Sequence, residues 1–467
     1  MASLPPSPRC SKLRSSFRFV ADTARFMTEC ASLGDAFTVN VFGLPPIVIV
    51  RKPEDVKAVF TDSGDTMLAG ALNARTLRPF LGDHSILLMD GKVHHKRRQL
   101  LSPPYHGDRM RLYGPSMTDV ADEAIERWPV GRPFKLLHAM HGITVRVILR
   151  SVFGRRDRAA EDRFAEAVMS WFDLAGWGPL LLPAMQVDLG PLSPWGRFRR
   201  KARALDALLY EEIAAHRRRL AAGEPGGEDM LSGLIEALDV NGQRLTDQEI
   251  RDELVTVFIA GHGTSATSLS WSVRWLAEQT ELWDELVDEL ARAADTGPLT
   301  PEAIAALPLL DMTVKEVLRL QPVFPFAGRL LGRPTKVGAW ELPEGVAVFC
   351  SVFLAQRDPA VFEEPLRFNP RRFLGGRRYS PFEYFPWGGG TRRCLGVNFA
   401  TYEIKMVLAR LLSRTRFALR NKEPIREVFA AAALVPSEGL PVVMTERHGR
   451  DRRPGRPSAT AQAVARG

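Results

Sequence analysis

Residues 384–396 depart most clearly from the pattern of an ordinary helix or strand. They read Tyr384-Phe385-Pro386-Trp387-Gly388-Gly389-Gly390-Thr391-Arg392-Arg393-Cys394-Leu395-Gly396. Successive glycines allow the backbone to approach another group closely. Cys394 follows two arginines and precedes a segment with helical spacing at residues 397–415. Both the arginines and the free N–H groups of a helix start favour thiolate over thiol, so we expect Cys394 to carry chemistry.

A thiolate in this loop could be a nucleophile or a metal ligand. A nucleophile usually has a histidine base beside it, whereas the neighbours here are Arg392 and Arg393, which are not bases at neutral pH. One anionic sulfur ligand among backbone amides suits a metal centre better. A buried, inert cysteine beside a glycine turn is the remaining alternative, and the charged surroundings disfavour it.

The composition is typical of a soluble, folded protein. Of the 467 residues, 45% are hydrophobic and 25% charged, which is enough apolar surface to offset chain entropy. The four cysteines are too sparse for a disulfide scaffold and lack zinc-finger spacing, and Cys10, Cys30 and Cys350 are expected to be inert thiols. The sequence has no run of about 18 uninterrupted apolar residues, so we expect no membrane span and a cytoplasmic location.

The net charge of +9 is unevenly distributed along the chain. Residues 446–467 hold six arginines and two acids, and the remaining excess is too mild to argue for nucleic-acid binding. Residues 1–16 are rich in Pro and Ser and are expected to be flexible. A single domain is predicted over 17–446, followed by a disordered basic tail over 447–467.

Helical spacing predominates from about residue 52 to 320, and short strands and turns follow. The predicted elements include a hairpin over 38–42 and 47–50, one helix over 302–320, a helix over 397–415, and strands over 428–434 and 441–445. The longest helix starts at a capping box formed by Thr246 and Glu249 and extends to about residue 279. At roughly 1.5 Å per residue it is about 50 Å long and should cross the whole domain.

The middle of this long helix contradicts helix propensity. Gly261 and Gly263 are followed by Thr264 and Ser265. Each glycine costs about 1 kcal/mol relative to Ala, and the hydroxyls can bond back to backbone carbonyls and open the helix. A weak point in mid-helix often marks a site. Close helix packing against small residues is the alternative interpretation.

Together these segments resemble the cytochrome P-450 superfamily of haem-thiolate monooxygenases. Residues 387–396 are similar to its haem-binding signature, with Trp387 where Phe is more usual, and the resemblance covers roughly residues 30–445. It implies a mainly α fold with small β-sheets and a long central helix over the haem. It also implies haem b, with Cys394 as the iron ligand and Gly388 in the loop that binds the cofactor.

Two further motifs match this family. The segment Glu316-Val317-Leu318-Arg319 matches its Glu-x-x-Arg, and spacing of three puts both charges on one helical face. The resemblance implies that Arg372, in the Pro-Arg-Arg-Phe segment at 370–373, completes a structural network that locks the cysteine segment.

The segment 90–98 resembles the helix that contacts the haem propionates in this family. His94 and Arg98 are four residues apart and share a face, and two cationic donors suit two carboxylates. Arg392 and Arg329 match two further propionate-binding positions. A solvated basic face or a nucleic-acid-binding patch is the alternative for His94 and Arg98.

Residues 260–265 resemble the oxygen-binding groove of the family. The resemblance implies that Thr264 is the alcohol that handles protons for O2 activation. Gly263 stands where the family has an acid, so the acid–alcohol pair is incomplete. Water held by Thr264, Ser265 and the freed backbone carbonyls could substitute; the alternatives are an enzyme that is slow, leaks peroxide or takes peroxide directly. His262 is predicted to be a packing residue.

The resemblance implies a haem monooxygenase that hydroxylates an apolar organic substrate with O2. Fatty acids, terpenoids and polyketide-like molecules all fit, and Ala260, Val323 and Ala327 are candidate pocket residues. The alternatives are a peroxide-using or rearranging haem enzyme and, from another class, a non-catalytic haem-based sensor or binding protein.

Electrons must come from outside the chain, because it lacks a dinucleotide-binding fingerprint. A ferredoxin or flavodoxin with a reductase is the expected donor to a monomeric protein. Arg97, Arg371, Arg392 and Arg393 are candidates for a basic docking face for such an acidic partner, and scattered solvated arginines are the alternative.

Overall fold

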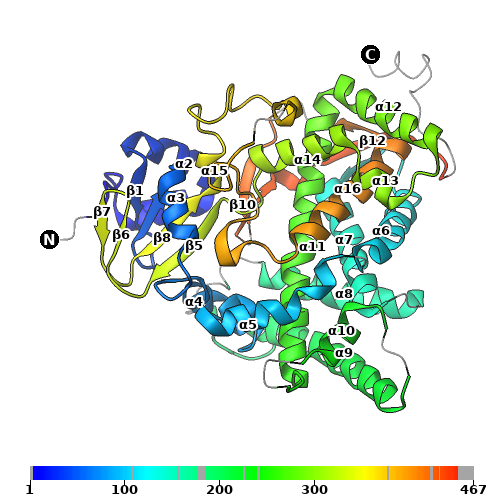
Figure 1. Ribbon diagram of the computed structural model, residues 1–467, viewed down its shortest axis with the longest axis horizontal. Helices are drawn as coiled ribbons and strands as arrows, with labels where there is room; N and C mark the ends of the chain where they lie inside the picture. Colours follow the sequence, from blue (N-terminus) through cyan, green and yellow to red (C-terminus); the bar gives the residue numbers. More distant parts are fainter. Residues whose placement is uncertain are drawn as a thin grey trace.

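The computed structural model describes residues 4–107, 109–154, 157–176, 180, 185–224, 227–238, 242–375, 378–420, 424–430 and 432–450. Helices account for most of them (Figure 1), so the predicted mainly α fold with small sheets is confirmed. The helices are α1 (Lys12–Ala21), α2 (Thr23–Cys30), α3 (Pro53–Phe60), α4 (Ala69–Leu81), α5 (Gly91–Leu101), α6 (Arg109–Ile125), α7 (Leu136–Phe153), α8 (Arg158–Ala175), α9 (Pro194–Ala221), α10 (Met230–Glu236), α11 (Asp247–Glu278), α12 (Thr280–Thr296), α13 (Pro301–Ala305), α14 (Pro308–Leu320), α15 (Val352–Ala355) and α16 (Val397–Arg414).

The sheets are small and lie at the edges of the helical body. The strands are β1 (Ala36–Val39), β2 (Ile47–Val50), β3 (Met67–Leu68), β4 (Pro133–Lys135), β5 (Phe326–Leu331), β6 (Thr335–Val337), β7 (Trp340–Leu342), β8 (Ala347–Ser351), β9 (Thr415–Leu419), β10 (Glu427–Ala430), β11 (Ala433–Pro436) and β12 (Pro441–Arg447). The largest sheet has the order β1-β2-β8-β5-β3 and lies at the left in Figure 1. Its strands β1 and β2 form the predicted antiparallel hairpin, and β2 pairs in parallel with β8.

Helix α11 runs through the centre of the helical body, as the sequence predicts (Figure 1). Its capping box is present, because the Thr246 side chain accepts from the Glu249 N–H at 3.2 Å and the Glu249 carboxylate accepts from the Thr246 N–H at 2.9 Å. Helices α7, α9 and α16 pack against it. The helix therefore links the elements that carry the cysteine loop to the rest of the core.

Two predicted elements are divided in the structure. The helix predicted over 302–320 breaks between α13 and α14, because Pro308 disfavours helical geometry at Leu307, whose φ and ψ are −66° and 118°. The strand predicted over 428–434 is the hairpin β10–β11, which pairs Ala430 with Ala433. The φ of Ala432 is 67° in the turn of this hairpin, a left-handed conformation that local propensity does not predict.

The ends of the chain are more ordered than the sequence suggests. Helix α1 begins inside the segment 1–16 that is expected to be flexible, because the Ser11 side chain caps it and Phe19 is buried. At the other end, the N–H of His448 donates to the Arg414 carbonyl at 2.7 Å, so the predicted tail over 447–467 begins too early. Its residues 451–467 lie outside the described part of the chain.

One helix, α7, is long and apolar enough to cross a membrane by length and composition alone. Two thirds of that segment is buried in the fold (67%), where α7 packs against α11 and α6. A core helix with this degree of burial passes the same test, so α7 gives no separate indication of a membrane span.

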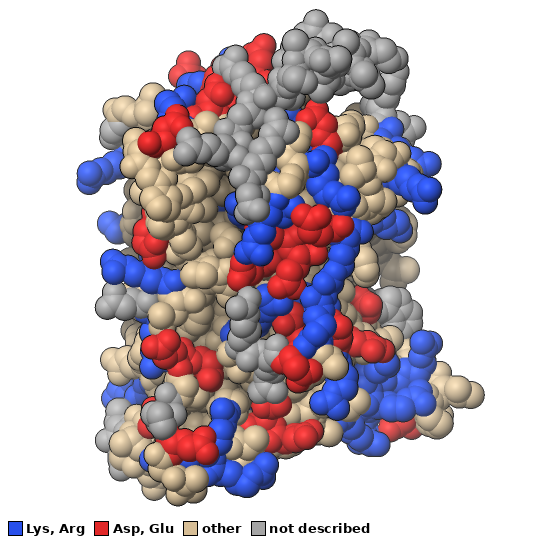
Figure 2. All heavy atoms as spheres, turned by 90° about the vertical axis from the view of Figure 1, so that its right-hand side faces the viewer, with Lys and Arg blue, Asp and Glu red and all other residues tan. Residues whose placement is uncertain are grey.

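Opposite charges are interleaved on the surface. Figure 2 shows Lys and Arg side chains alternating with Asp and Glu across the middle of one face. Ion pairs of this kind join α6, α7 and α8, where Arg150 contacts Glu161 at 2.9 Å and Glu123 at 3.0 Å. Much of the chain's charge is therefore locally compensated.

A buried carboxylate fixes the segment that leads to the cysteine loop. Glu316 is completely buried on α14 and accepts from Arg319 at 2.8 Å and from Arg372 at 2.9 Å. The backbone N–H of Asn369 donates to the same carboxylate at 2.8 Å. Glu316, Arg319 and Arg372 thus form one network.

Gln356 connects this network to the cysteine loop. Its backbone carbonyl accepts from Arg319 at 2.7 Å, and its side-chain amide donates to the carbonyls of Leu318 and Arg319. The side-chain oxygen of Gln356 accepts from the N–H of Phe385 at 3.0 Å. No local sequence pattern predicts this role of Gln356, because it depends on contact between two segments that are distant in the chain.

Replacing Glu316 with Gln is expected to destabilise the fold by about 3–5 kcal/mol, because it leaves two buried guanidinium groups without a counter-charge. Urea unfolding measures the effect. The matched control is Glu364→Gln, which removes an exposed ion pair with Arg367 of the same 2.8 Å length and should change stability little. Equal effects of the two substitutions would contradict the structural role of Glu316.

Candidate functional site

The glycines of the cysteine loop make close backbone packing possible. Gly388 and Gly390 have φ values of 66° and 62°, in the left-handed region. A Cβ atom on Gly389 or Gly390 would overlap Phe60 at the end of α3. The group that this part of the loop approaches closely is therefore the protein itself, and the glycines press the loop against α3.

Cys394 lies between this loop and α16. Its backbone N–H donates to the Trp387 carbonyl at 2.9 Å, which closes the loop three residues before the helix begins. Burial raises the pKa of the thiol above its usual 9.0, although the N–H of Gly396 and the charges of Arg98 and Arg393 oppose this change. In the protein alone, burial thus opposes the predicted thiolate, while the neighbouring arginines favour it. A bound metal cation must supply the missing stabilisation.

Four basic side chains from three parts of the chain converge near Cys394. His94 and Arg98 come from α5, Arg329 from β5 and Arg392 from the cysteine loop. Burial, followed by the charges of Arg392 and Arg98, lowers the pKa of His94 to about 3. His94 is therefore neutral in the protein alone, which corrects the prediction that it is a cation.

The arginines of this cluster outnumber the acids that compensate them. Arg392 donates to the Met89 carbonyl and to Asp90, while burial and the charges of Arg329 and Arg98 lower its pKa to about 10. Burial also lowers the pKa of Arg329 and of Arg98, and within the described residues the Arg98 side chain has no hydrogen-bond partner or ion pair. This arrangement fits a ligand that carries two carboxylates.

One face of the central helix borders open space inside the protein. Ala260 is exposed and Thr264 is half-exposed, although His262 and Ser265 on the same helix are buried. The Thr264 hydroxyl donates to the Ala260 carbonyl at 2.6 Å, so it bonds back to the helix as predicted. Exposure at positions i and i+4 of a central helix indicates a hollow along that face.

The space beside Gly263 is filled by an aromatic ring. A Cβ on Gly263 would lie 2.9 Å from the Phe172 ring of α8. The ring of Phe172 packs edge-on against His262 at 4.2 Å between centroids, and His141 of α7 lies 4.9 Å from His262. His262 is fully buried, and burial lowers its pKa to about 4. An acid at position 263 would need Phe172 to move.

Ser265 points away from the exposed face of α11 and toward α16. Its hydroxyl hydrogen bonds to Glu403 at 2.5 Å, and both residues are buried. Burial raises the pKa of Glu403 from 4.5 to about 8, and its other carboxylate oxygen has no partner among the described residues. Glu403 is not among the residues predicted from the sequence, although an acid nine residues after Cys394 in an apolar helix is a detectable signal.

The remaining predicted residues have different surroundings. Ala327 is half-buried on β5, and Val323 is buried before that strand. Arg97, which was expected on a basic docking face, is largely buried, because it pairs with Glu249 at 2.5 Å and approaches Glu253.

Of the other arginines expected on a docking face, Arg371 pairs with Glu285 at 2.6 Å, and Arg392 is paired with Asp90 as described above. Arg393 is exposed and has no ion pair within the described residues. The four residues therefore do not form the basic docking face that the sequence suggested.

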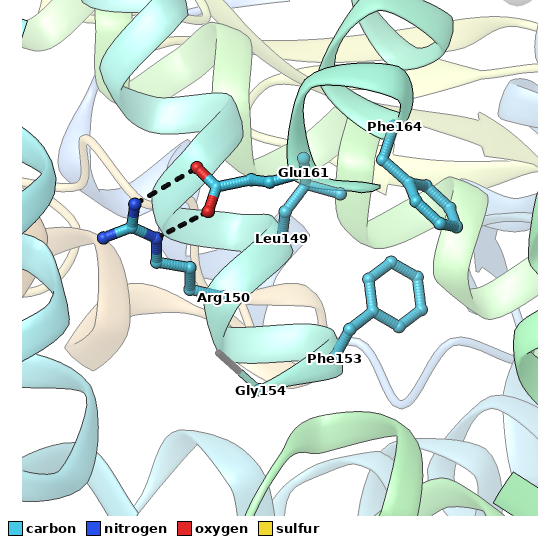
Figure 3. A pocket seen from close by; sticks show the side chains of 6 residues that line it. All are labelled: Leu149, Arg150, Phe153, Gly154, Glu161 and Phe164. Carbon is cyan, nitrogen blue, oxygen red and sulfur yellow. Dashed lines mark hydrogen bonds and ion pairs between the residues drawn. The ribbon is translucent and has the colours of Figure 1, made fainter. Parts of the chain in front are cut away.

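A small pocket between α7 and α8 is separate from this site (Figure 3). Leu149, Arg150, Phe153, Gly154, Glu161 and Phe164 line it. The figure shows the Arg150 guanidinium joined to the Glu161 carboxylate at one side, while Phe153 and Phe164 face each other. None of these residues belongs to the cysteine loop or to the basic cluster.

The fold is mainly helical, Cys394 lies beside a basic cluster, and the central helix has an accessible face. Together these features define a haem-thiolate protein. The cytochrome P-450 family model matches residues 17–442. Cytochrome P-450 135B1 of Mycobacterium tuberculosis H37Rv is 34% identical over 465 residues, which is 99% of this chain and 94% of the relative. Cytochrome P-450 138 of Mycobacterium bovis is 32% identical over 449 residues, with coverage of 95% and 97%. The chain therefore belongs to the cytochrome P-450 family and is a haem monooxygenase.

Solved structures have the same fold. Cyanobacterial CYP120A1 with bound retinoic acid superposes with a TM-score of 0.81 at 23% identity, covering 96% of this chain and all of the other (100%). The haem domain of cytochrome P-450DA gives 0.82 at 21% identity, with coverage of 97% and 100%. These likenesses support the fold, and the family follows from the closer sequence relatives.

Membership of this family identifies the cofactor as haem b with Cys394 as the iron ligand. The site fits this group. Within the described residues Asp90 pairs with Arg392 alone; two propionates would supply the further anionic partners that the basic cluster needs, and the iron would favour the thiolate that burial disfavours.

Replacing Arg98 with Gln is expected to affect the haem-free and haem-loaded proteins in opposite ways. The haem-free chain loses a half-buried cation that has no ion pair within the described residues, so its urea midpoint should be equal or higher. The loaded chain loses a charge-assisted hydrogen bond of about 1.5–3 kcal/mol, so haem transfer to apomyoglobin should be roughly ten- to a hundredfold faster. The exposed Arg393→Gln variant is the control and should transfer haem near the wild-type rate. A lower urea midpoint with unchanged transfer would count against this assignment.

Replacing Glu403 with Gln is expected to flatten part of the pH dependence of stability. Because burial raises the folded pKa from 4.5 to about 8, the contribution of Glu403 is fully present below pH 4.5 and is lost as the pH rises toward 8. Gln is neutral throughout, so the variant should gain stability over wild type between about pH 5 and 8 in urea unfolding. The exposed Glu341→Gln is the control, and a constant difference across this range would refute the buried, neutral carboxyl.

Proposed function

We propose that this monooxygenase hydroxylates an apolar organic molecule, of the fatty-acid, terpenoid or polyketide-like classes, with electrons from a separate ferredoxin or flavodoxin and its reductase. The hollow beside the central helix carries this proposal. Its exposed residue Ala260 is apolar, and half-buried Phe326 and Ala327 lie on β5, the strand that also carries Arg329. Few charges are available on these surfaces to solvate an ionic substrate.

The side chains of the basic cluster would hold the cofactor. Arg98, Arg329 and Arg392 would bind the propionates, and neutral His94 would donate a ring N–H to one of them. Cys394 would provide the sulfur ligand. When bound, haem supplies the oxidising chemistry that inserts one oxygen atom of O2 into a C–H bond. The chain contributes orientation, exclusion of water and protons.

An acid at position 263 cannot supply protons in this chain, because that residue is Gly263. Thr264 reaches the exposed face of the helix, and its hydroxyl can exchange its bond to the Ala260 carbonyl for one to a water in the hollow. Ser265, next along the helix, hydrogen bonds to the buried carboxyl of Glu403. We propose that protonated Glu403 is the proton store behind this segment and that Ser265 positions it.

Phe172 gives weight to a second candidate, a peroxide-using or rearranging enzyme. Because its ring fills the space beside Gly263, the usual acid has no room there. An enzyme that starts from peroxide needs fewer delivered protons, so it tolerates this replacement. The two candidates differ in their need for an electron donor.

Turnover assays separate these candidates. The haem-loaded protein is first screened with apolar compounds for a spin-state shift in the Soret band. Hits are then assayed with NADPH, a surrogate ferredoxin and its reductase, and separately with hydrogen peroxide alone. Product that forms only with the redox proteins supports the monooxygenase; product with peroxide alone supports the second candidate.

Variants identify which residues matter. Cys394→Ala should lose the thiolate-type band of the reduced CO complex, and its retention would defeat the site assignment. Glu403→Gln should raise peroxide release per NADPH consumed if Glu403 is the proton store. Unchanged coupling in this variant would reject that role while leaving the monooxygenase assignment in place.

A further inference from the structure

Helix α1 presents an apolar ridge at the surface. Leu13, Phe17 and Val20 are 73%, 72% and 58% exposed, and their spacing of four and three residues places them on one face of the helix. Phe42, in the turn between β1 and β2, is 67% exposed, and its N–H donates to the Ser16 hydroxyl at 2.7 Å. This bond holds the turn against α1, so the four side chains belong to one patch, which we name the α1 ridge.

The other face of α1 is firmly packed. Ser15 and Phe19 are buried, and the Phe19 ring stacks on Phe326 at 5.8 Å and meets Phe429 edge-on at 6.0 Å. The helix lies with the first sheet at the N-terminal end of the molecule, the dark blue end in Figure 1. The α1 ridge is therefore an outer surface of an anchored helix, and several large apolar side chains exposed together indicate a binding surface.

Basic side chains border the α1 ridge. Arg9, Lys12 and Arg14 are exposed, and within the described residues their side chains have no ion pair. Glu29, the acid of α2, is already engaged by Arg25 at 3.0 Å, and the bonds from arginines hold its pKa below its usual value. The ridge therefore has a rim of three basic side chains that form no ion pair with an acid of the described residues.

We propose that the α1 ridge docks on the surface of an anionic lipid bilayer. A helix that lies flat, with large apolar side chains outward and Lys or Arg at its flanks, is suited to the boundary between headgroups and acyl chains. Each basic residue near an anionic membrane adds to the attraction, and this part weakens with salt. The ridge is convex, so it can enter a deformable surface.

A second copy of the chain fits this surface less well. A stable dimer uses about 20–30 residues a side, and the ridge offers four large side chains from one helix and one turn. An acidic protein would pair with the basic rim but would leave the apolar ridge without a role. The bilayer alone uses both features.

Vesicle flotation of the full-length, haem-loaded protein tests this proposal. Vesicles of equal phosphatidylcholine and phosphatidylglycerol are compared with phosphatidylcholine alone, at low and at high NaCl. The protein should float with the anionic vesicles, and binding should fall at least about fivefold in high salt. The Leu13→Ser/Phe17→Ser variant should bind at least about tenfold more weakly, because the two apolar side chains of the ridge with the highest exposed fractions are lost.

Two further variants and one control complete the test. Phe42→Ser should weaken binding independently of any effect on α1, and Lys12→Gln/Arg14→Gln should remove most of the salt dependence. Leu374→Ser changes an equally exposed leucine outside the ridge (61%) and should bind like wild type. Thermal melts by circular dichroism should match wild type for every variant, since each altered side chain is exposed.

Three results would overturn the proposal. One is unchanged vesicle binding in the Leu13→Ser/Phe17→Ser variant. Another is a wild-type protein that does not bind vesicles but forms a concentration-dependent dimer in sedimentation, with the dimer lost in this variant. That result would assign the ridge to a second copy. The third is vesicle binding that soluble polyglutamate abolishes by competition and that is the same in the Leu13→Ser/Phe17→Ser variant as in wild type. That result would assign the basic rim to an acidic protein. Each result leaves the monooxygenase activity untouched, so it bears on the ridge alone.

Discussion

The buried carboxylate of Glu316 is the interaction on which the catalytic half of the molecule depends. A charge without water is stable only when it is fully paired, and Glu316 receives Arg319, Arg372 and one backbone N–H. From Arg319, hydrogen bonds pass through Gln356 to the N–H of Phe385, at the start of the cysteine loop. The cysteine loop is irregular and lacks the regular backbone hydrogen bonds of a helix or strand. The hydrogen bonds that start at the charge of Glu316 therefore hold it in place.

The electrostatics of the site are unfavourable in the protein alone and favourable with its cofactor. Burial raises the pKa of the Cys394 thiol, and the arginines of the basic cluster lower one another's pKa. Both effects reverse when an iron cation and two carboxylates enter, because each buried charge then gains a partner. The sequence pattern selected these residues by chemical type and assigned them the protonation states of the loaded site. The difference arises because burial depends on how distant segments pack.

The central helix shows which features local sequence patterns can predict and which depend on contacts with distant segments. The glycines and hydroxyls at 261–265 correctly marked a special segment, and the capping box correctly marked where its helix begins. Two contacts could be identified only from the fold. Phe172, from a helix some ninety residues earlier, fills the space beside Gly263, and Glu403 of α16 hydrogen bonds to Ser265. No spacing rule connects these residues, since their contacts depend on helix packing. The same holds for Arg97, which was expected on a docking face and which instead pairs with Glu249 of α11.

The sequence by itself determined the family, the mainly helical class, the single cysteine that carries chemistry and the set of basic residues around it. These features are local, because turns, caps and short motifs depend on neighbours within a few residues. Only the tertiary structure decided which arginines remain available, which carboxyl is neutral, and that α1 keeps one apolar face outside. These properties depend on burial and on partners from distant segments, and both exist only once the chain has packed.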